Sequence, residues 1–329
     1  MSERIIKPYD KPAGGWDSLK RSWQALRDEG IVVIGAGTML RTNQSDGFDC
    51  PGCAWPDRNP NSTFEFCENG VKAVAAEATS KRVTREFFAA HTVAELAAQE
   101  DHWLEAQGRL TEPMRYDAAS DRYLPLAWDE AFAQIARTLQ SLASPDEALF
   151  YTSGRTSNEA AFLYQLFVRE YGTNNLPDCS NLCHEASGVA LIEQIGSGKG
   201  SVTLEDFERA EAIFVFGQNP GTNHPRMLGE LRAAAKRGCR IVAFNPLRER
   251  GLERFAHPQS AKDMLTGSST TIASRYWQPR IGGDLAVASG MLKVLLARDA
   301  VDRAFIGQYT TGFEALAQSL HDTPWERIE

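Results

Sequence analysis

The chain has 329 residues and a formal net charge of -8, from 35 lysines and arginines against 43 aspartates and glutamates. This length predicts two or more domains, and the scattered basic residues exclude the basic surface typical of nucleic-acid or anionic-membrane binding. No apolar run reaches the length of a membrane span, and residues 1–16 lack the hydrophobic core of a signal peptide. We therefore expect a cytoplasmic protein.

The first 110 residues are expected to be largely irregular. Apolar spacing predicts a helix over 16–29, a strand over 31–34, and helices over 71–79 and 92–107. Residues 41–68 have almost no apolar periodicity, so this segment cannot build a hydrophobic core of its own. We expect a bound metal to order it.

Cysteines supply the candidate ligands for that metal, because six in a chain of this length are too few for a disulfide scaffold. They form two groups and one single residue: Cys50, Cys53 and Cys67; Cys179 and Cys183; and Cys239, which opens a predicted strand. The first group, a Cys-Pro-Gly-Cys turn with a third thiol after thirteen intervening residues, suits a structural zinc ion or an iron–sulfur cluster. His91 or His102 is a candidate fourth zinc ligand, and the spacing leaves the metal open.

From about residue 110 the pattern alternates between helices and strands. Helices are predicted over 128–142, up to Tyr171, over 226–237 and over 284–296, and strands over 148–152, 212–216 and 240–244. Gly238 ends the third helix, and a long loop is expected between 245 and 284. This alternation is typical of βαβ units, so we expect an α/β fold with parallel strands and ligands at their carboxyl ends.

Polar residues follow two of these strands. The loop 217–225, GQNPGTNHP, precedes a helix, and its N–H groups can hold phosphate, although an ordinary turn is the alternative. Asn245 follows the next strand, where a nucleotide ribose is commonly bound. Asp284 begins a helix after two glycines, where helix N-capping is the alternative role.

A further candidate site lies in residues 174–190, NNLPDCSNLCHEASGVA, where Cys183 and His184 are neighbours. The turn residues before the pair and the small apolar residues after it predict a helix that starts at the site. A thiolate can ligate a soft metal, and an imidazole can move protons beside it. The alternative is a core cysteine next to a surface histidine.

The motifs CPGC, CENG, GRTSNE, NLCHEASG, GQNPGTNHP and a post-strand NP occur in this order. In that order they resemble the molybdopterin oxidoreductases, specifically the formate-dehydrogenase-like alpha subunits and their YdeP-like branch, which is associated with acid resistance. The resemblance covers essentially the whole chain. It implies a Mo-bis(molybdopterin guanine dinucleotide) cofactor and a [4Fe-4S] cluster.

The same resemblance implies a domain organisation. Residues 1–109 would form an irregular iron–sulfur region, followed over 110–329 by parallel-sheet α/β domains of the molybdopterin oxidoreductase fold. Within these, 110–175 would be the first part of a discontinuous domain and 176–329 an incomplete dinucleotide-binding domain. Residues 323–326, Thr-Pro-Trp-Glu, predict a capping box that opens a helix just before the last residue, so we expect a truncated chain.

Site residues are also implied by the resemblance. Cys183 corresponds to the molybdenum ligand, His184 to the histidine that handles substrate protons, and the first cysteine group to cluster ligands. The residues that correspond to the pterin and guanine dinucleotide loops are Gly154, Arg155, Ser157, Asn158, Asn219, Asn223, His224, Asn245 and Asp284.

Two positions depart from the family pattern. Residues 54–57 read Ala-Trp-Pro-Asp where relatives with four cluster cysteines have another cysteine, so Asp57 is a candidate ligand, with a labile or absent cluster as the alternative. Asn69 stands where the family has a lysine that bridges cluster and pterin, and Lys72 is the candidate substitute.

The activity implied by the resemblance is the two-electron oxidation of formate or a similar small substrate at molybdenum, with electrons passed to the cluster. An electron-transfer protein is the expected partner, and neither nucleic acid nor a membrane is expected. The alternatives are an inactive truncated remnant and a nucleotide-binding α/β protein with a structural zinc.

Overall fold

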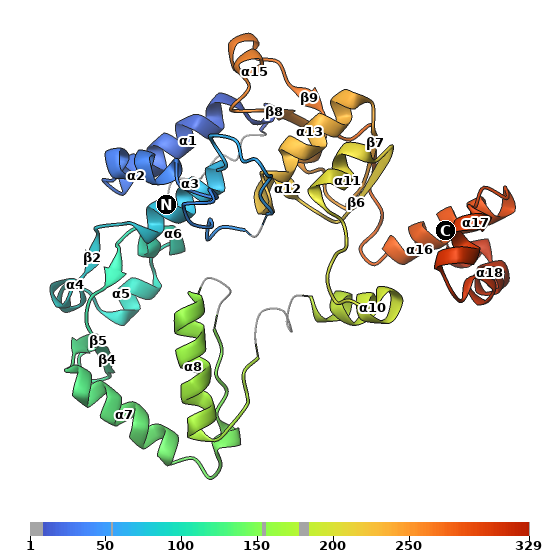
Figure 1. The fold of residues 1–329 in the computed structure, drawn as a ribbon. Coiled ribbons are helices and arrows are strands. Elements are labelled where there is room, and N and C mark those ends of the chain that lie inside the picture. Colours follow the sequence, from blue (N-terminus) through green and yellow to red (C-terminus); the bar gives the residue numbers. More distant parts are fainter. Residues whose placement is uncertain (1–8, 54, 153–155, 178–183, 329) are drawn as a thin grey trace. The chain divides into compact units, whose positions relative to one another are not determined.

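The computed structural model describes residues 9–53, 55–152, 156–177 and 184–328. These residues form a mixed α/β fold with parallel strand pairs, which confirms the expected fold class (Figure 1). The chain divides into two compact units, one of Met1–Lys20 with Thr203–Glu329 and the other of Arg21–Val202. The domain boundaries after residues 109 and 175 stay a prediction.

The unit of Arg21–Val202 is mostly helical. Helix α1, Gly15–Asp28, runs into it. Its further helices are α2 (Val32–Met39), α3 (Glu68–Glu77), α4 (Arg85–Ala90), α5 (Val93–Ala97), α6 (Asp101–Glu105), α7 (Trp128–Gln140), the 3-10 turn η1 (Pro145–Glu147), α8 (Asn158–Tyr171) and α10 (Glu185–Ile195). Its strands are β2 (Arg82–Val83), parallel to β3 (Arg109–Leu110), and β4 (Met114–Asp117), antiparallel to β5 (Arg122–Pro125).

A small core fixes α3 in this unit. Val71, Val74 and Ala75 of α3 pack with Leu26 of α1 and with Ile31 and Met39 at the ends of α2. Fully burying a valine or leucine side chain contributes roughly 1.5–3 kcal/mol, so these contacts hold α3 firmly against both helices. The helix that follows Cys67 is therefore a rigid support.

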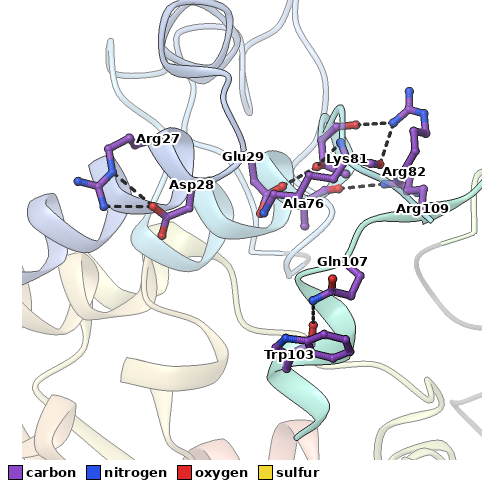
Figure 2. A network of polar contacts seen from close by, with 10 residues as sticks. Arg27, Asp28, Glu29, Ala76, Lys81, Arg82, Trp103, Gln107 and Arg109 are labelled. Carbon is purple, nitrogen blue, oxygen red and sulfur yellow. Dashed lines mark hydrogen bonds and ion pairs between the residues drawn. The ribbon is translucent and has the colours of Figure 1, made fainter. Parts of the chain in front are cut away.

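Polar contacts tie the far end of α3 to its surroundings (Figure 2). Lys81 Nζ lies 3.0 Å from Glu29 Oε1, just after α1. Arg109 Nη2 donates to the carbonyl oxygen of Ala76 at 3.1 Å. Strands β2 and β3 are thus fastened to α1 and to α3.

The other unit contains a parallel sheet with the strand order β10-β7-β6. Its strands are β6 (Ala212–Phe216), β7 (Arg240–Phe244) and β10 (Arg275–Trp277), and a second sheet joins β1 (Ala13–Gly14), β8 (Arg254–Ala256) and β9 (Thr270–Thr271). Its helices are α11 (Leu204–Arg209), α12 (Pro220–Asn223), α13 (Met227–Arg237), α14 (Arg250–Glu253), α15 (Ala261–Thr266), α16 (Asp284–Ala297), α17 (Arg303–Tyr309), α18 (Phe313–Asp322) and the 3-10 turn η2 (Trp325–Arg327).

The two faces of the β10-β7-β6 sheet differ. Val215, Ile241 and Ala243 share one face and are buried, and α13 packs against β7. Phe214 and Phe216 alternate with Val215 and are exposed on the opposite face. Phe244 pairs with Phe216 on this second face and is buried, so among the described residues the second face is only partly covered.

Most predicted elements are confirmed, including the helices at 16–29, 71–79, 128–142, 226–237 and 284–296 and the strands at 212–216 and 240–244. The helix predicted to end at Tyr171 is α8, and the one predicted to start at the Cys183-His184 site is α10. Gly238 ends α13 with φ 94°, as predicted.

The strand predicted over 31–34 is wrong, because Val32–Met39 is the helix α2. Its buried positions, Ile31, Gly35 and Met39, recur every four residues, which is a helical spacing that a four-residue window does not reveal. The strand predicted over 148–152 is also wrong. There, the N–H of Phe150 donates to Asn175, but no ladder forms among the described residues.

Three other predictions need correction. The helix predicted over 92–107 is interrupted, since α5 ends at Ala97 and α6 starts at Asp101 after an extended Glu100. The long loop predicted between 245 and 284 holds α14, β8, α15, β9 and β10. Thr323 is not an N-cap: its hydroxyl donates to Ser319 at the end of α18, and Pro324 precedes η2.

Candidate functional site

The three N-terminal cysteines gather at the N-terminus of α3. Cys67 is the N-cap of this helix, and its Sγ accepts the N–H of Gly70 at 3.4 Å. A methyl group added to Gly70 would lie 3.0 Å from Cys50 Sγ and 3.8 Å from Cys67 Sγ, so the two thiols flank this glycine. The Cys-Pro-Gly-Cys turn thus lies against the first turns of α3.

The electrostatics of this group disfavour a free thiolate at Cys67. Burial raises the pKa of the Cys67 thiol, the sulfurs of Cys50 and Cys53 raise it further, and the Gly70 N–H opposes both. Three thiolates so close together repel one another, and a metal centre would relieve that repulsion. The N–H of Gly52 also donates to Cys50 Sγ, at 3.3 Å, as expected of groups that orient metal ligands.

The geometry of the donor set bears on the kind of metal centre. Among the described residues, no three His, Cys, Asp or Glu side chains converge as ligands of one metal ion. An iron–sulfur cluster binds each cysteine through a different iron, so its sulfurs do not have to meet at one point. Three half-buried thiols, two of which accept a backbone N–H, therefore fit three ligands of a cluster.

The structure also describes three other residues that were predicted near this centre. Lys72 is half-exposed and pairs with Glu68, with 2.6 Å between Nζ and Oε1. The ring of His91 packs against Phe87, 4.8 Å between centroids. Asp57 is exposed.

The second candidate site falls partly outside the described residues. Cys183, Gly154 and Arg155 lie there. His184 is the exposed N-cap of α10, and its carbonyl accepts the N–H of Gly188 at 2.8 Å. Ser157 is the N-cap of α8 and accepts from Ala160, and Asn158 is the first residue of that helix. These residues start helices, where N–H groups favour anions.

The carboxyl ends of β6, β7 and β10 lie at one edge of their sheet, because the three strands are parallel. The N–H of Gly217 after β6 donates to Phe244 at 2.8 Å, and the N–H of Asn245 after β7 donates to Trp277 at 3.0 Å. The loops that start at these residues therefore lie side by side, as expected for a parallel α/β sheet.

Two asparagine amides fasten these loops together. Asn245, only 4% exposed, donates to the carbonyl of Gln218 at 3.2 Å and accepts the N–H of Leu247 at 2.8 Å. Asn219 donates to Glu249 Oε2 at 2.7 Å and accepts the N–H of Thr222 at 3.2 Å, as the N-cap of α12. The structure thus brings these two predicted residues to the same edge.

The remaining predicted residues lie at helix ends. Asn223 is exposed at the end of α12, and His224 follows as its half-buried C-cap. Asp284 is exposed and is the first residue of α16, but Gly283 is the N-cap, so N-capping by Asp284 is wrong. A groove of about 970 Å³ adjoins this loop, lined by Phe214, by residues 279–283 and by α16.

Three residues of the candidate sites were not predicted from the sequence. Gly70 belongs to the CENG motif, but no contact with the cysteines was predicted for it. Glu249 contacts Asn219, and Asn43 contacts Cys50 and Glu65. Both residues lie in segments without apolar periodicity, and no sequence pattern predicts these contacts.

Comparisons with known proteins identify the family of the chain. The molybdopterin oxidoreductase family model matches residues 109–312. "Protein YdeP" of Escherichia coli (strain K12) is 51% identical over 99% of this chain, and "F420-dependent formate dehydrogenase 1 subunit alpha" of Methanococcus maripaludis is 32% identical over 59% of it and 26% of that subunit. The solved structure of acetylene hydratase from Pelobacter acetylenicus matches with a TM-score of 0.51 and 20% identity over 66% of this chain and 28% of that one, a likeness of fold.

The chain spans 44% of the length of YdeP. Among the residues that the structure describes, no helix is both long and apolar enough to cross a bilayer.

Proposed function

This chain belongs to the molybdopterin oxidoreductase family, and we propose that it supplies the iron–sulfur region and part of the cofactor-binding fold of a molybdenum-dependent oxidoreductase. The observation that carries the proposal is that Cys50 and Cys67 flank Gly70, with Cys53 near enough to act electrostatically on Cys67. Bound molybdopterin guanine dinucleotide would supply two-electron redox chemistry at molybdenum, and a cluster would accept those electrons.

The chain's own residues have distinct roles in this proposal. The three thiolates hold the cluster, and the N–H groups of Gly52 and Gly70 stabilise their negative charge. Cys183 ligates molybdenum, and His184 takes the substrate proton on its imidazole. The loops at the carboxyl edge of the β10-β7-β6 sheet hold a nucleotide through N–H groups and the α12 and α13 N-termini.

Formate or a similarly small molecule is the proposed substrate, and an electron-transfer protein the proposed partner. The support is the formate dehydrogenase subunit that is 32% identical to part of this chain. The whole protein's substrate is tested by dye-linked oxidation assays on the complete gene product, with formate first.

Metal analysis of anaerobically purified protein tests the cluster. We expect iron and acid-labile sulfide, and loss of both in Cys50→Ser and Cys67→Ser. Cys239→Ser is the matched control, because Cys239 is buried at the start of β7, in the other unit. Zinc without iron would instead support the structural-zinc alternative and overturn the cluster.

A second test addresses molybdenum in the complete gene product. Cys183→Ala should remove dye-linked dehydrogenase activity while leaving the iron content unchanged. Unaltered activity in this variant would show that Cys183 is not the ligand.

A further inference from the structure

Two separate stretches of chain carry the cluster cysteines, and one asparagine side chain joins them. Asn43 donates through Nδ2 to the carbonyl oxygen of Glu65 at 2.6 Å, two residues before Cys67. Its Oδ1 accepts the N–H of Cys50 itself at 2.8 Å. A single amide therefore spans the gap between the Cys50–Cys53 turn and the start of α3.

The backbone of Asn43 is held equally tightly. Its N–H donates to Phe48 at 2.7 Å, which closes the loop before Cys50, and its carbonyl accepts Asn61 Nδ2 at 2.9 Å. All of these groups lie around a residue that is only 6% exposed. Buried amide contacts of this kind fix a single arrangement, because breaking one leaves a buried polar group unpaired.

The residue type matches the position for two reasons. Asn43 has φ 57°, a left-handed conformation that asparagine tolerates better than most residues. An amide is also the side chain that offers a donor and an acceptor from adjacent atoms. Aspartate would keep the acceptor for Cys50 but turn an oxygen towards the Glu65 carbonyl, and glycine would keep only the backbone conformation.

We propose that Asn43 is the positioning residue of the iron–sulfur centre: it sets the separation between the Cys50–Cys53 turn and Cys67. The proposal rests on the proposed function for the identity of the metal centre. It adds a residue that contacts no metal itself and acts through the backbone of one ligand and the segment leading to another.

The first experiment compares iron and sulfide content and the electron paramagnetic resonance spectrum of the reduced cluster in the parent, Asn43→Gly and Asn43→Asp. We expect less iron and an altered spectrum in Asn43→Gly, with partial recovery in Asn43→Asp because the bond from Cys50 survives. Asp299→Gly is the matched control, since Asp299 is also left-handed, with φ 50°, but is exposed and far along the chain. Parent-like iron content and spectrum in Asn43→Gly would overturn the proposal.

A second experiment separates this proposal from the proposed function. Cd²⁺ is added to the metal-free, reduced protein, and its binding is followed by the thiolate-to-metal absorption, since soft thiolates prefer soft metals. We expect the Cd²⁺ dissociation constant of Asn43→Gly to rise about tenfold, the lower end of the effect of removing groups that orient metal ligands. If the parent lacks iron, the cluster assignment fails, but a higher Cd²⁺ dissociation constant in Asn43→Gly still supports positioning of the cysteines by Asn43. Equal Cd²⁺ dissociation constants in the parent and Asn43→Gly would refute the positioning role.

Discussion

At the scale of single residues, Gly70 is the tightest point of the cysteine site. Alanine there would place its methyl group 3.0 Å from Cys50 Sγ, closer than ordinary van der Waals contact. We expect Gly70→Ala to push the Cys-Pro-Gly-Cys turn away from α3 and to lower the iron content, measured per chain by metal analysis. Gly37→Ala is the control, because a methyl group at Gly37 meets nothing within 4 Å. Equal iron in both variants would contradict this packing.

We expect His257 to make the stability of its unit depend on pH. Burial lowers the pKa of its imidazole, and the positive charges of Arg232 and Lys236 lower it further. The negative charges of Asp263 and Glu230 act in the opposite direction but do not cancel this shift. Its Nδ1 accepts the N–H of Gln259 at 3.1 Å, and a proton on Nδ1 would break that bond. The neutral imidazole is thus the form that fits the fold.

The sign of the pH effect follows from this lowered pKa. Above the ordinary histidine value of 6.5 both states are neutral, and below it the unfolded chain binds a proton that the folded chain disfavours. We therefore expect the urea midpoint to fall as the pH drops from about 6.5 through the folded-state pKa. In His257→Gln this fall should become smaller, whereas in His321→Gln, an exposed control, it should remain. The same fall in both variants would rule out His257 as its source.

At the scale of elements, Lys293 holds α18 against α16. Its Nζ donates to the carbonyls of Leu320 and Thr323, each at 2.7 Å, and lies 5.6 Å from the centre of the Trp325 ring. A lysine in this place satisfies the last carbonyls of α18, which have no partner within the helix.

Replacing Lys293 with methionine keeps the apolar stem but removes these donors. We expect Lys293→Met to lower the free energy of unfolding by about 1.5–3 kcal/mol, the usual range for hydrogen bonds that involve a charged group. The measurement is urea unfolding followed by tryptophan fluorescence, with the exposed Lys262→Met as control. If the variant is as stable as the parent, water must hydrogen-bond the carbonyls of Leu320 and Thr323 as favourably as Lys293 does.

Helices and strands with long, regular apolar spacing could be predicted from the sequence, and those set by contacts elsewhere could not. Helix α13 and strands β6 and β7 have clear periodicity and a glycine stop at Gly238. Helix α2 looked like a strand because Ile31–Ile34 are apolar in succession, and only its packing with Leu26 and Val71 reveals the helix. The short strands β8, β9 and β10 are ordered by their partners rather than by their own composition.

The same division applies to the candidate site. The cysteines could be located because thiols in a segment without apolar periodicity have few other uses, and the order of the motifs indicated the family. Asn43 and Glu249 could not, because their roles depend on partners 22 and 30 residues away in the chain. Spacing rules do not extend to single side-chain contacts over such separations.

At the scale of the whole molecule, the candidate sites fall in different units: the three N-terminal cysteines and His184 belong to Arg21–Val202, and the carboxyl edge of the β10-β7-β6 sheet belongs to the unit with Thr203–Glu329. The rigid elements beneath them differ accordingly. A packed helix, α3, carries the cysteines, whereas a parallel sheet carries the loops of the edge.

The partly covered face of that sheet, which carries Phe214, Phe216 and Trp277, leads to a prediction for the chain as a whole. Parallel sheets are usually covered on both faces, yet Phe214 is 53% exposed and Trp277 is 59% exposed. Exposed apolar side chains of this kind bind hydrophobic dyes and partners when they gather into a patch. We expect the chain to enhance the fluorescence of 8-anilinonaphthalene-1-sulfonate and the double variant Phe214→Thr with Trp277→Thr to reduce that signal, with far-ultraviolet circular dichroism unchanged.

Val33→Thr is the control, because Val33 is exposed on α2, in the other unit. An undiminished signal in the double variant would place the dye-binding surface elsewhere, since threonine retains the strand but removes most of the apolar area.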